Sequence, residues 1–236
     1  MSVQTNNTPA PRTGEPLPRK ALHRRRLPQQ MRARNTVDAI FEATERLAAA
    51  HEFDALNTRM IAERAGVSIG SLYQYFPTCE AILLAWYERV STDAAKDIRL
   101  STIEVLDRSL REALKIAIRR LLDIYTRNRL VLIDLPLQVP RIEQVIRYTS
   151  LEVLNRGNIR LYLSHHPEYD LSRMEAHVFY IETLIHALMR RHVRDAPEGI
   201  GADDLVEQIC GFIMGYLEGQ RVALPPGRLP DGPQGT

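Results

Sequence analysis

The sequence has few of the features of secreted, disulfide-stabilised or membrane-spanning proteins. Its two cysteines, Cys79 and Cys210, form no CxxC pair and have no neighbouring pair of histidines, so we expect neither a disulfide framework nor a zinc site. No apolar run reaches the roughly 20 residues of a membrane-spanning helix. The amino-terminal residues are polar and rich in proline and arginine, and they lack the apolar core of a signal peptide. We therefore expect a soluble, cytoplasmic protein without a membrane partner.

Catalytic motifs are also missing. The sequence has no P-loop and no GxSxG motif, and His51-Glu52 lacks the second histidine of an HExxH site because position 55 is alanine. The seven histidines are dispersed. Those inside helical stretches, such as His177 and His186, are more typical of polar core groups than of metal ligands. We expect no enzymatic activity, no catalytic residues, no cofactor and no bound metal.

Positive charge is concentrated at the amino-terminal end. The net charge of the chain is only +2, but residues 1–34 carry eight basic side chains against a single acidic one. That end therefore carries +7, which leaves −5 for the rest, a distribution typical of a protein whose one end meets a polyanion. Residues 1–30 are predicted to be a disordered basic arm, in which Arg24, Arg25 and Arg26 bind DNA phosphates or enter a minor groove. The alternative is a solvated tail.

Residues 58–76 predict two short helices joined by a tight turn. Asn57 or Thr58 is suited to cap the first helix, and Gly66 follows its last apolar position, where a left-handed stop is common. Ser68 is suited to cap the second helix. The outer face of this second helix carries hydroxyls, an amide and aromatic rings. Core packing explains these groups poorly, whereas insertion into a DNA major groove explains them well.

The sequence of residues 62–76, AERAGVSIGSLYQYF, resembles the helix-turn-helix of TetR-family bacterial transcriptional regulators. The shared pattern is A-E-x-A-G-V-S-x-G-x-L-Y-x-Y-F. The resemblance extends upstream through a helix expected at about 34–50 and downstream to Val90, whereas the rest of the chain resembles the family only in length and helical character. It implies an all-α fold, with an amino-terminal three-helix DNA-binding domain and a carboxy-terminal helical domain for ligand binding and dimerisation.

The resemblance also implies which residues meet DNA. Arg59 matches a position early in the first helix of the motif that reaches a base, where an arginine fork pairs with guanine. Tyr73 and Ser71 match positions that bind phosphates and set the register, and Gln74 is suited to adenine. Cys79 departs from the family, which usually has a phosphate-binding lysine there. The positions of the second helix expected at the DNA are Ile69, Gly70, Ser71, Tyr73, Gln74 and Tyr75.

Apolar periodicity after the motif predicts helices up to about residue 222. Thr78 is suited to cap a helix that runs past Val90. Further helices are expected at about 103–129, 141–164, 172–193 and 202–222. Residues 130–140 are apolar and broken by two prolines, which favours a short helix or an irregular segment over a buried strand. The predicted organisation is a basic arm at 1–30, a DNA-binding domain at 31–77, a regulatory and dimerisation domain at 78–223 and a loose tail at 224–236.

The last expected helix carries three glycines four residues apart, Gly211, Gly215 and Gly219. Each glycine costs a helix about 1 kcal/mol relative to alanine, so a line of three favours the close approach of another helix. Packing within one chain is the alternative. The family resemblance, which implies a four-helix dimer bundle, favours a homodimer. The residues expected at its interface are Ile181, Ile185, Leu188, Gly211, Phe212, Gly215 and Gly219.

The family resemblance also implies a ligand pocket between the helices of residues 100–195. Apolar walls with a few tyrosine and histidine groups suit a hydrophobic or aromatic small molecule. The expected lining residues, each of which also fits an ordinary core position, are Trp86, Leu121, Tyr125, Leu132, Tyr148, Tyr162, Phe179 and His186.

The resulting hypothesis is a homodimeric transcriptional regulator that binds double-stranded operator DNA. It is expected to be a repressor that a small effector releases from a palindromic operator. The first alternative is an effector-independent or architectural DNA-binding protein that works through a protein partner. The second is an enzyme built on the same helical scaffold, which the absence of a catalytic constellation disfavours.

Overall fold

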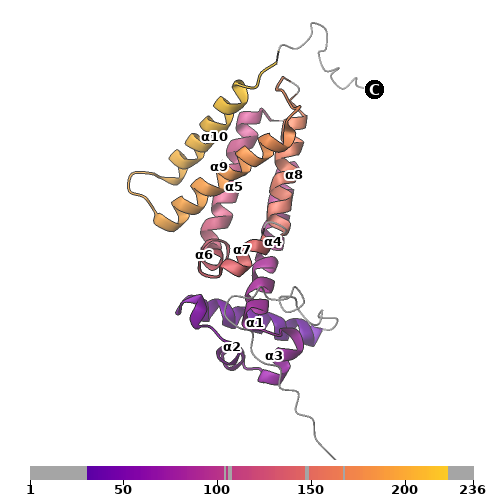
Figure 1. Ribbon diagram of the computed structural model, residues 1–236, viewed down its shortest axis with the longest axis vertical. Helices are drawn as coiled ribbons and strands as arrows, with labels where there is room; N and C mark the ends of the chain where they lie inside the picture. Colours follow the sequence, from indigo (N-terminus) through magenta and orange to yellow (C-terminus); the bar gives the residue numbers. More distant parts are fainter. Residues whose placement is uncertain (1–30, 104, 106–107, 147–148, 167, 223–236) are drawn as a thin grey trace, which may run out of the picture. The chain divides into compact units, whose positions relative to one another are not determined.

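The computed structural model describes residues 31–103, 105, 108–146, 149–166 and 168–222 (Figure 1). The predicted arm, the predicted tail and Tyr148 lie outside these residues. Within them every regular element is helical, apart from a single β-bridge between Tyr169 and Arg221. None of the described helices combines the length and the apolar character that crossing a membrane requires. The elements are α1 (Met31–Ala48), η2 (Phe53–Ala55), α2 (Thr58–Arg64), α3 (Ile69–Tyr75), α4 (Cys79–Ile103), α5 (Leu110–Arg127), η3 (Leu130–Asp134), α6 (Leu135–Gln138), α7 (Pro140–Ile146), α8 (Ser150–Ser164), α9 (Met174–Asp195) and α10 (Ala202–Glu218).

The chain divides into two compact units. Among the described residues, the first unit comprises residues 31–88 and 135–144, and the second comprises those between 89 and 134 and between 145 and 222. Helix α4 therefore begins in the first unit and continues into the second. The short helix α6 joins the first unit because its last residue binds η2: Gln138 Oε1 accepts a hydrogen bond from the Phe53 N–H at 3.2 Å.

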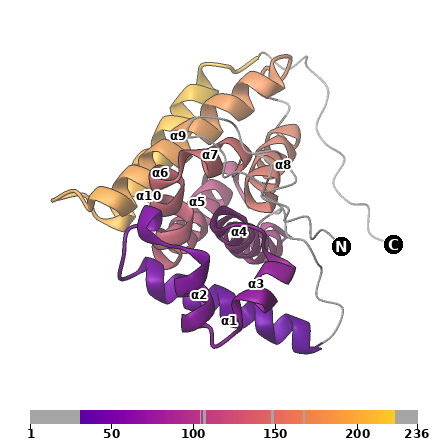
Figure 2. The ribbon, with the colours of Figure 1, turned by 60° about the horizontal axis from the view of Figure 1, so that its bottom comes forward.

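Helices α1, α2 and α3 and the start of α4 pack around one apolar centre in the first unit (Figure 2). Ile40, Ile61 and Leu72, one from each of the first three helices, have no exposed surface. The rings of Phe41 and Phe76 lie with their centroids 5.8 Å apart. Because each helix gives its apolar face to this centre, the polar faces of α2 and α3 remain outside.

Local sequence sets the boundaries of α2 and α3, as predicted. Asn57 is the cap of α2, since its side chain accepts hydrogen bonds from the N–H groups of Arg59 (3.1 Å) and Met60 (3.0 Å). Gly66 has φ of 66°, the left-handed conformation that glycine adopts at little cost. Ser68 Oγ accepts the Ser71 N–H at 3.1 Å and caps α3.

Helices α5, α8, α9 and α10 form the body of the second unit (Figure 1). Helix α5 packs against α9 and α10, and α8 packs against α9. The later part of α4 joins this unit through Ser91, whose buried Oγ accepts the Leu151 N–H of α8 at 2.9 Å. The apolar side of α5 supplies much of the core, including the fully buried Ile118 and Ile124.

The largest differences from the predicted helix boundaries occur in two helices. In place of a helix at 103–129, α5 begins at Leu110, because Ser109 and Glu112 form a capping box with reciprocal hydrogen bonds of 3.4 and 3.2 Å. In place of a helix at 141–164, α7 ends at Ile146 and α8 begins at Ser150. Apolar periodicity continues across such breaks, so it does not reveal them. The apolar segment after α5 forms a π-helical turn followed by the short α6, as expected for a segment interrupted by proline.

Candidate DNA-binding surface and cavity

The outer face of α3 carries most of the residues predicted to meet DNA. Leu72 and Phe76 are fully buried, which turns the remaining side chains of α3 outward. Tyr73 keeps 42% of its surface exposed. Arg59 is exposed in the first turn of the neighbouring α2. The other exposed residues of the set are Ile69, Gly70 and Gln74, and the half-buried ones are Ser71 and Tyr75.

Hydroxyl groups on this face are held by neighbouring hydroxyls. The Tyr73 hydroxyl lies 3.0 Å from Oγ1 of Thr58, the first residue of α2. Ser71 Oγ lies 2.8 Å from Ser68 Oγ. A hydroxyl has one donor and two acceptor sites, so each of these groups retains capacity for a further partner. The arrangement fixes the hydroxyls on the exposed face, where phosphate oxygens are suitable partners.

Cys79 begins α4 and is oriented inward. Its Sγ donates to the carbonyl oxygen of Leu56 at 3.5 Å. Burial, reinforced by the negative charge of Glu80, raises the pKa of the Cys79 thiol to about 12. The side chain is therefore an uncharged thiol at neutral pH and supplies no cation for a phosphate. Arg24, Arg25 and Arg26 of the predicted basic arm lie outside the described part of the chain.

The second unit contains a cavity of about 70 Å³. On the same measure one water molecule needs only ~10–15 Å³, so the space is large enough for a small organic group. Its walls come from α5, α8, α9 and α10, with Ile98 of α4. Most of the lining is leucine and isoleucine. The polar lining residues are Asn155, Asn158, Tyr162, Glu182 and His186.

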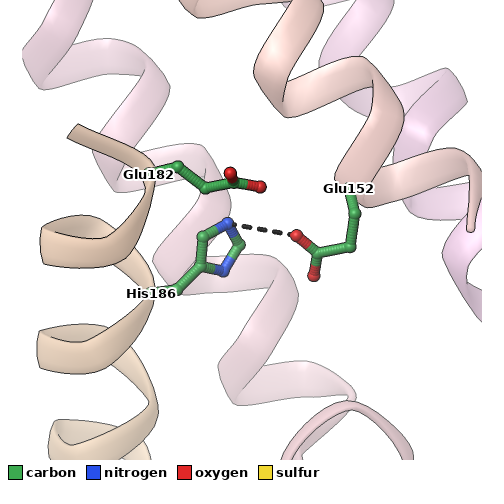
Figure 3. A group of neighbouring side chains, drawn as sticks. All are labelled: Glu152, Glu182 and His186. Carbon is green, nitrogen blue, oxygen red and sulfur yellow. Dashed lines mark ion pairs between the residues drawn. The ribbon is translucent and has the colours of Figure 1, made fainter. Parts of the chain in front are cut away.

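A polar cluster forms part of the cavity wall (Figure 3). Glu182 and His186 lie one turn apart on α9 and point toward Glu152 of α8. His186 Nε2 is 3.4 Å from Glu152 Oε2. His186 Nδ1 is 2.6 Å from the hydroxyl of Tyr125 on α5. Arg156 donates to Glu182 Oε1 at 3.0 Å. Three helices therefore contribute polar side chains to one cluster.

Burial shifts the pKa values of two groups in this cluster. It lowers the pKa of His186 to about 4, with the positive charge of Arg190 acting in the same direction. It raises the pKa of Glu152, against the opposing effects of Arg190 and Arg156. The imidazole of His186 is therefore uncharged at neutral pH.

Asn155, one turn after Glu152 on α8, leaves a polar group unpartnered in the cavity wall. The residue is 9% exposed, and among the described residues its Nδ2 has no hydrogen-bond partner. Buried amide groups are rarely left without a partner, so this position is one where a ligand or water would be expected to bind.

Comparison with known families places the helix-turn-helix unambiguously. Residues 40–86, from α1 through the motif into α4, match the family model of bacterial regulatory proteins of the tetR family. These residues carry a TetR-family helix-turn-helix domain. The protein is a transcriptional regulator with a DNA-binding helix-turn-helix, as the motif predicts.

Solved TetR-type structures share the fold over most of the chain, whereas no curated protein sequence matches it. The fatty acid degradation regulator FadR from Bacillus halodurans has 18% identity and a TM-score of 0.63 and covers 75% of this chain and 94% of its own. The TetR-family repressor FadR from Thermus thermophilus, solved with lauroyl-CoA, has 20% identity, a TM-score of 0.57 and coverages of 81% and 98%. A transcriptional regulator from Aquifex aeolicus has 18% identity, a TM-score of 0.54 and coverages of 77% and 99%. The all-α fold is confirmed.

The structure places only some of the residues predicted for a ligand pocket at this cavity. Leu121, Tyr162 and His186 line the cavity. Tyr125 does not line it, but its hydroxyl is hydrogen-bonded to His186. Three other predicted residues do not line it. Trp86 is buried in the first unit, Leu132 is buried elsewhere in the second, and Phe179 is 61% exposed. Periodicity identifies apolar faces, but it does not separate a cavity wall from solid core. Binding of a ligand stays a prediction.

Helices α9 and α10 expose a continuous apolar surface. Phe179, Tyr180 and Phe212 are 61%, 51% and 56% exposed. The rings of Tyr180 and Tyr216 pack edge to face with centroids 5.9 Å apart, which connects the two helices on this side. Gly211 is exposed nearby. We call this surface, made of Phe179, Tyr180, Gly211, Phe212, Gly215 and Tyr216, the aromatic face.

The glycine line does not serve packing between the described helices of one chain. A Cβ added at Gly211 or Gly215 would meet no atom within 4 Å, and one at Gly219 would meet only backbone oxygens of α10. Ile181 and Ile185, which were also predicted at the interface, are buried in one chain and line the cavity from the inner side of α9. Leu188 is half-buried.

Sequence reasoning missed the acidic and amide groups of the cavity wall. Glu152 and Asn155 are three residues apart, and Glu182 and His186 are four apart, so each pair was readable as one helix face. Which helix faces which depends on tertiary packing, and this is why the two pairs were not brought together.

Proposed function

We propose that this TetR-family regulator is a homodimeric repressor that leaves a palindromic operator when a small apolar effector enters the cavity of the second unit. The apolar cavity is the observation that carries the effector part of the proposal. The proposal includes no catalytic step, and the protein acts on DNA in the cytoplasm.

DNA recognition is assigned to α3 and the first turn of α2. Arg59 and Gln74 are exposed and carry the forked donors and amide that pair with guanine and adenine edges. Tyr73 and Ser71 fix the register through phosphates. In a two-fold symmetric dimer, the two motifs read half-sites about 34 Å apart, one turn of the double helix.

The aromatic face is assigned to the dimer interface. Exposed aromatic side chains beside a line of unfilled glycine positions suit the close packing of helices from a second copy. The partner helices would bury Phe179 and Phe212, which in one protomer are more than half exposed. A two-fold axis through α9 and α10 brings the same surface of both copies together.

Effector binding acts by selecting one of two conformations. Helix α4 is suited to transmit this change of conformation. Its Ile98 lines the cavity, and its residues Cys79–Glu88 belong to the first unit, which carries the helix-turn-helix and is called the DNA-binding unit below. The effector lowers operator affinity only by as much as it binds one conformation more tightly than the other. Each tenfold loss of operator affinity therefore needs a difference in effector binding free energy of about 1.4 kcal/mol. The lauroyl-CoA bound to the Thermus thermophilus protein is one example of a ligand with an apolar acyl chain in this fold.

A two-stage experiment tests the proposal. Random duplexes selected by the purified full-length protein should converge on an inverted repeat. Compounds that raise the melting temperature, drawn from medium-chain acyl esters, acids and aromatic metabolites, should then lower operator affinity in fluorescence anisotropy. Ala117→Leu, which adds bulk to the cavity wall, should abolish both effects of the compound while leaving ligand-free operator binding unchanged. If compounds that raise the melting temperature leave operator affinity unchanged, the result favours the alternative of a DNA-binding protein that has no effector.

A further inference from the structure

Three side chains of the kinds that bind transition metals converge at the cavity wall, and two of them, Glu182 and His186, line the cavity. Glu152, Glu182 and His186 each offer one ligand atom, and these atoms all lie within 4.8 Å of one another (Figure 3). Glu182 and His186 come from successive turns of α9, and Glu152 comes from α8. The 3.4 Å between His186 Nε2 and Glu152 Oε2 equals the separation of ~3.4 Å that two ligands have when each lies ~2.1 Å from a tetrahedral ion.

The ring of His186 is already oriented as in a metal site. Its Nδ1 is bound at 2.6 Å to the Tyr125 hydroxyl, so Nε2 is directed at the carboxylates. Metal-binding histidines almost always use their second nitrogen for a hydrogen bond of this kind, which fixes the tautomer. The uncharged state of the imidazole, which its burial favours, is the state that binds a metal.

The charges around the cluster allow a cation. Glu152 is a buried carboxylate whose pKa is raised by desolvation, and a nearby cation would stabilise its ionised form. Arg156 bonds to Oε1 of Glu182 and Arg190 acts on Glu152, so the two carboxylates are balanced by two guanidinium groups even without an ion. A polar network of the protein alone is therefore the competing explanation. The unpartnered Nδ2 of Asn155 in the same wall is a hydrogen-bond donor, so it indicates a place for a water or for an acceptor group of a ligand beside the cluster and does not itself bind the cation.

We propose that Glu152, Glu182 and His186 bind a divalent transition-metal ion in the cavity wall. One imidazole and two carboxylates suit Zn²⁺ or Mn²⁺, whereas Mg²⁺ and Ca²⁺ prefer oxygen ligands alone. Three protein ligands leave a coordination position open. Since Glu182 and His186 line the cavity, this position is accessible to an effector; that last consequence rests on the proposed function, but the metal site does not.

Calorimetric titration of the untagged, full-length protein after chelation and dialysis tests the site. We expect one Zn²⁺ per chain, with Mg²⁺ binding at least 100-fold more weakly. Glu152→Gln, Glu182→Gln and His186→Ala should each weaken Zn²⁺ binding at least tenfold. Circular dichroism checks folding. Should His186→Ala fail to fold, Glu182→Gln decides, because Glu182 is half-buried and the substitution keeps its size.

Two controls separate this site from incidental binding. His166→Ala removes a second His–Glu pair, whose Nδ1 and Oε1 are 3.0 Å apart but which belongs to no such three-residue group in the described chain. A variant with Cys79→Ser and Cys210→Ser removes both thiols. Both control variants should keep full Zn²⁺ affinity. Absence of Zn²⁺ binding, or unchanged affinity in the two glutamine variants, would overturn the proposal. Operator binding is measured separately without metal, so either proposal can fail alone.

Discussion

The two units of the chain distribute polar and apolar side chains in opposite ways. The DNA-binding unit has a solid apolar centre, with Ile61 and Leu72 fully buried, and an exposed face of hydroxyl, amide and guanidinium groups. The second unit buries a carboxylate–imidazole cluster beside a cavity and exposes the aromatic face. The first arrangement suits a polar, charged partner on the outside. The second suits a small molecule inside and another apolar surface outside.

The largest expected effect comes from truncating the centre of the DNA-binding unit. Leu72→Ala leaves a hole in solid packing and should lower the free energy of unfolding by about 2–5 kcal/mol. The matched change Leu114→Ala removes the same atoms from a cavity wall and should cost less, because that side chain already lacks neighbours on one side. Urea unfolding followed by the fluorescence of Trp86, the single tryptophan, reports on the first unit, and circular dichroism reports on the whole chain. Equal losses for both variants would contradict the contrast in packing.

The next effect concerns the aromatic face. Gly215→Leu adds bulk where one protomer has open space, so the protomer should fold normally. The dimer should lose about 1–3 kcal/mol through overpacking, which sedimentation measures as a raised dissociation constant. Ala49→Leu, at an exposed alanine of the first unit, is the control. A dimer that forms with unchanged affinity would move the interface elsewhere.

Operator contacts come third. Arg59→Ala should weaken operator binding by about 1–3 kcal/mol and relax the preference at one base pair, without changing the melting temperature. Tyr73→Phe removes a hydroxyl held by Thr58 and should weaken operator and random duplex together. Anisotropy titrations with both duplexes separate the two roles. If both variants bind operator within twofold of the unchanged protein, Arg59 and Tyr73 do not make the proposed operator contacts.

The smallest effect at physiological salt is expected from the basic arm. Deleting residues 1–28 removes Arg24, Arg25 and Arg26 and should reduce the slope of log affinity against log salt by about 2–3, since each neutralised phosphate contributes about 0.9. Operator and random duplex should lose affinity alike, most strongly at low salt. Identical slopes for the full-length and shortened proteins would leave the arm as a solvated tail, and a larger loss on AT-rich flanks would indicate minor-groove reading.

The same contrast explains what the sequence predicts and what it does not. The caps Asn57 and Ser68 and the left-handed Gly66 act within a few residues of chain, so the helix-turn-helix was readable before any packing was known. The helical character of the second unit was also predictable from periodicity. The meeting of Glu152 with His186 was not, because it depends on how two helices are packed. Ile181 and Phe179 show the same limit: both are apolar residues of one helix, yet one lines the cavity and the other is exposed.

The half-buried, inward-pointing thiol of Cys79 has a consequence for the chemistry of oxidation. A cysteine in the first turn of a helix can be reactive, because the helix amides stabilise its thiolate. Here burial dominates, and with a pKa of about 12 only about one thiol in 10⁵ is ionised at pH 7. Oxidation by peroxide and thiol–disulfide exchange both proceed through the thiolate. The Cys79 sulfur should therefore resist conversion to a sulfenic acid and to a mixed disulfide with glutathione. Operator binding should therefore survive oxidants that inactivate regulators with exposed cysteines.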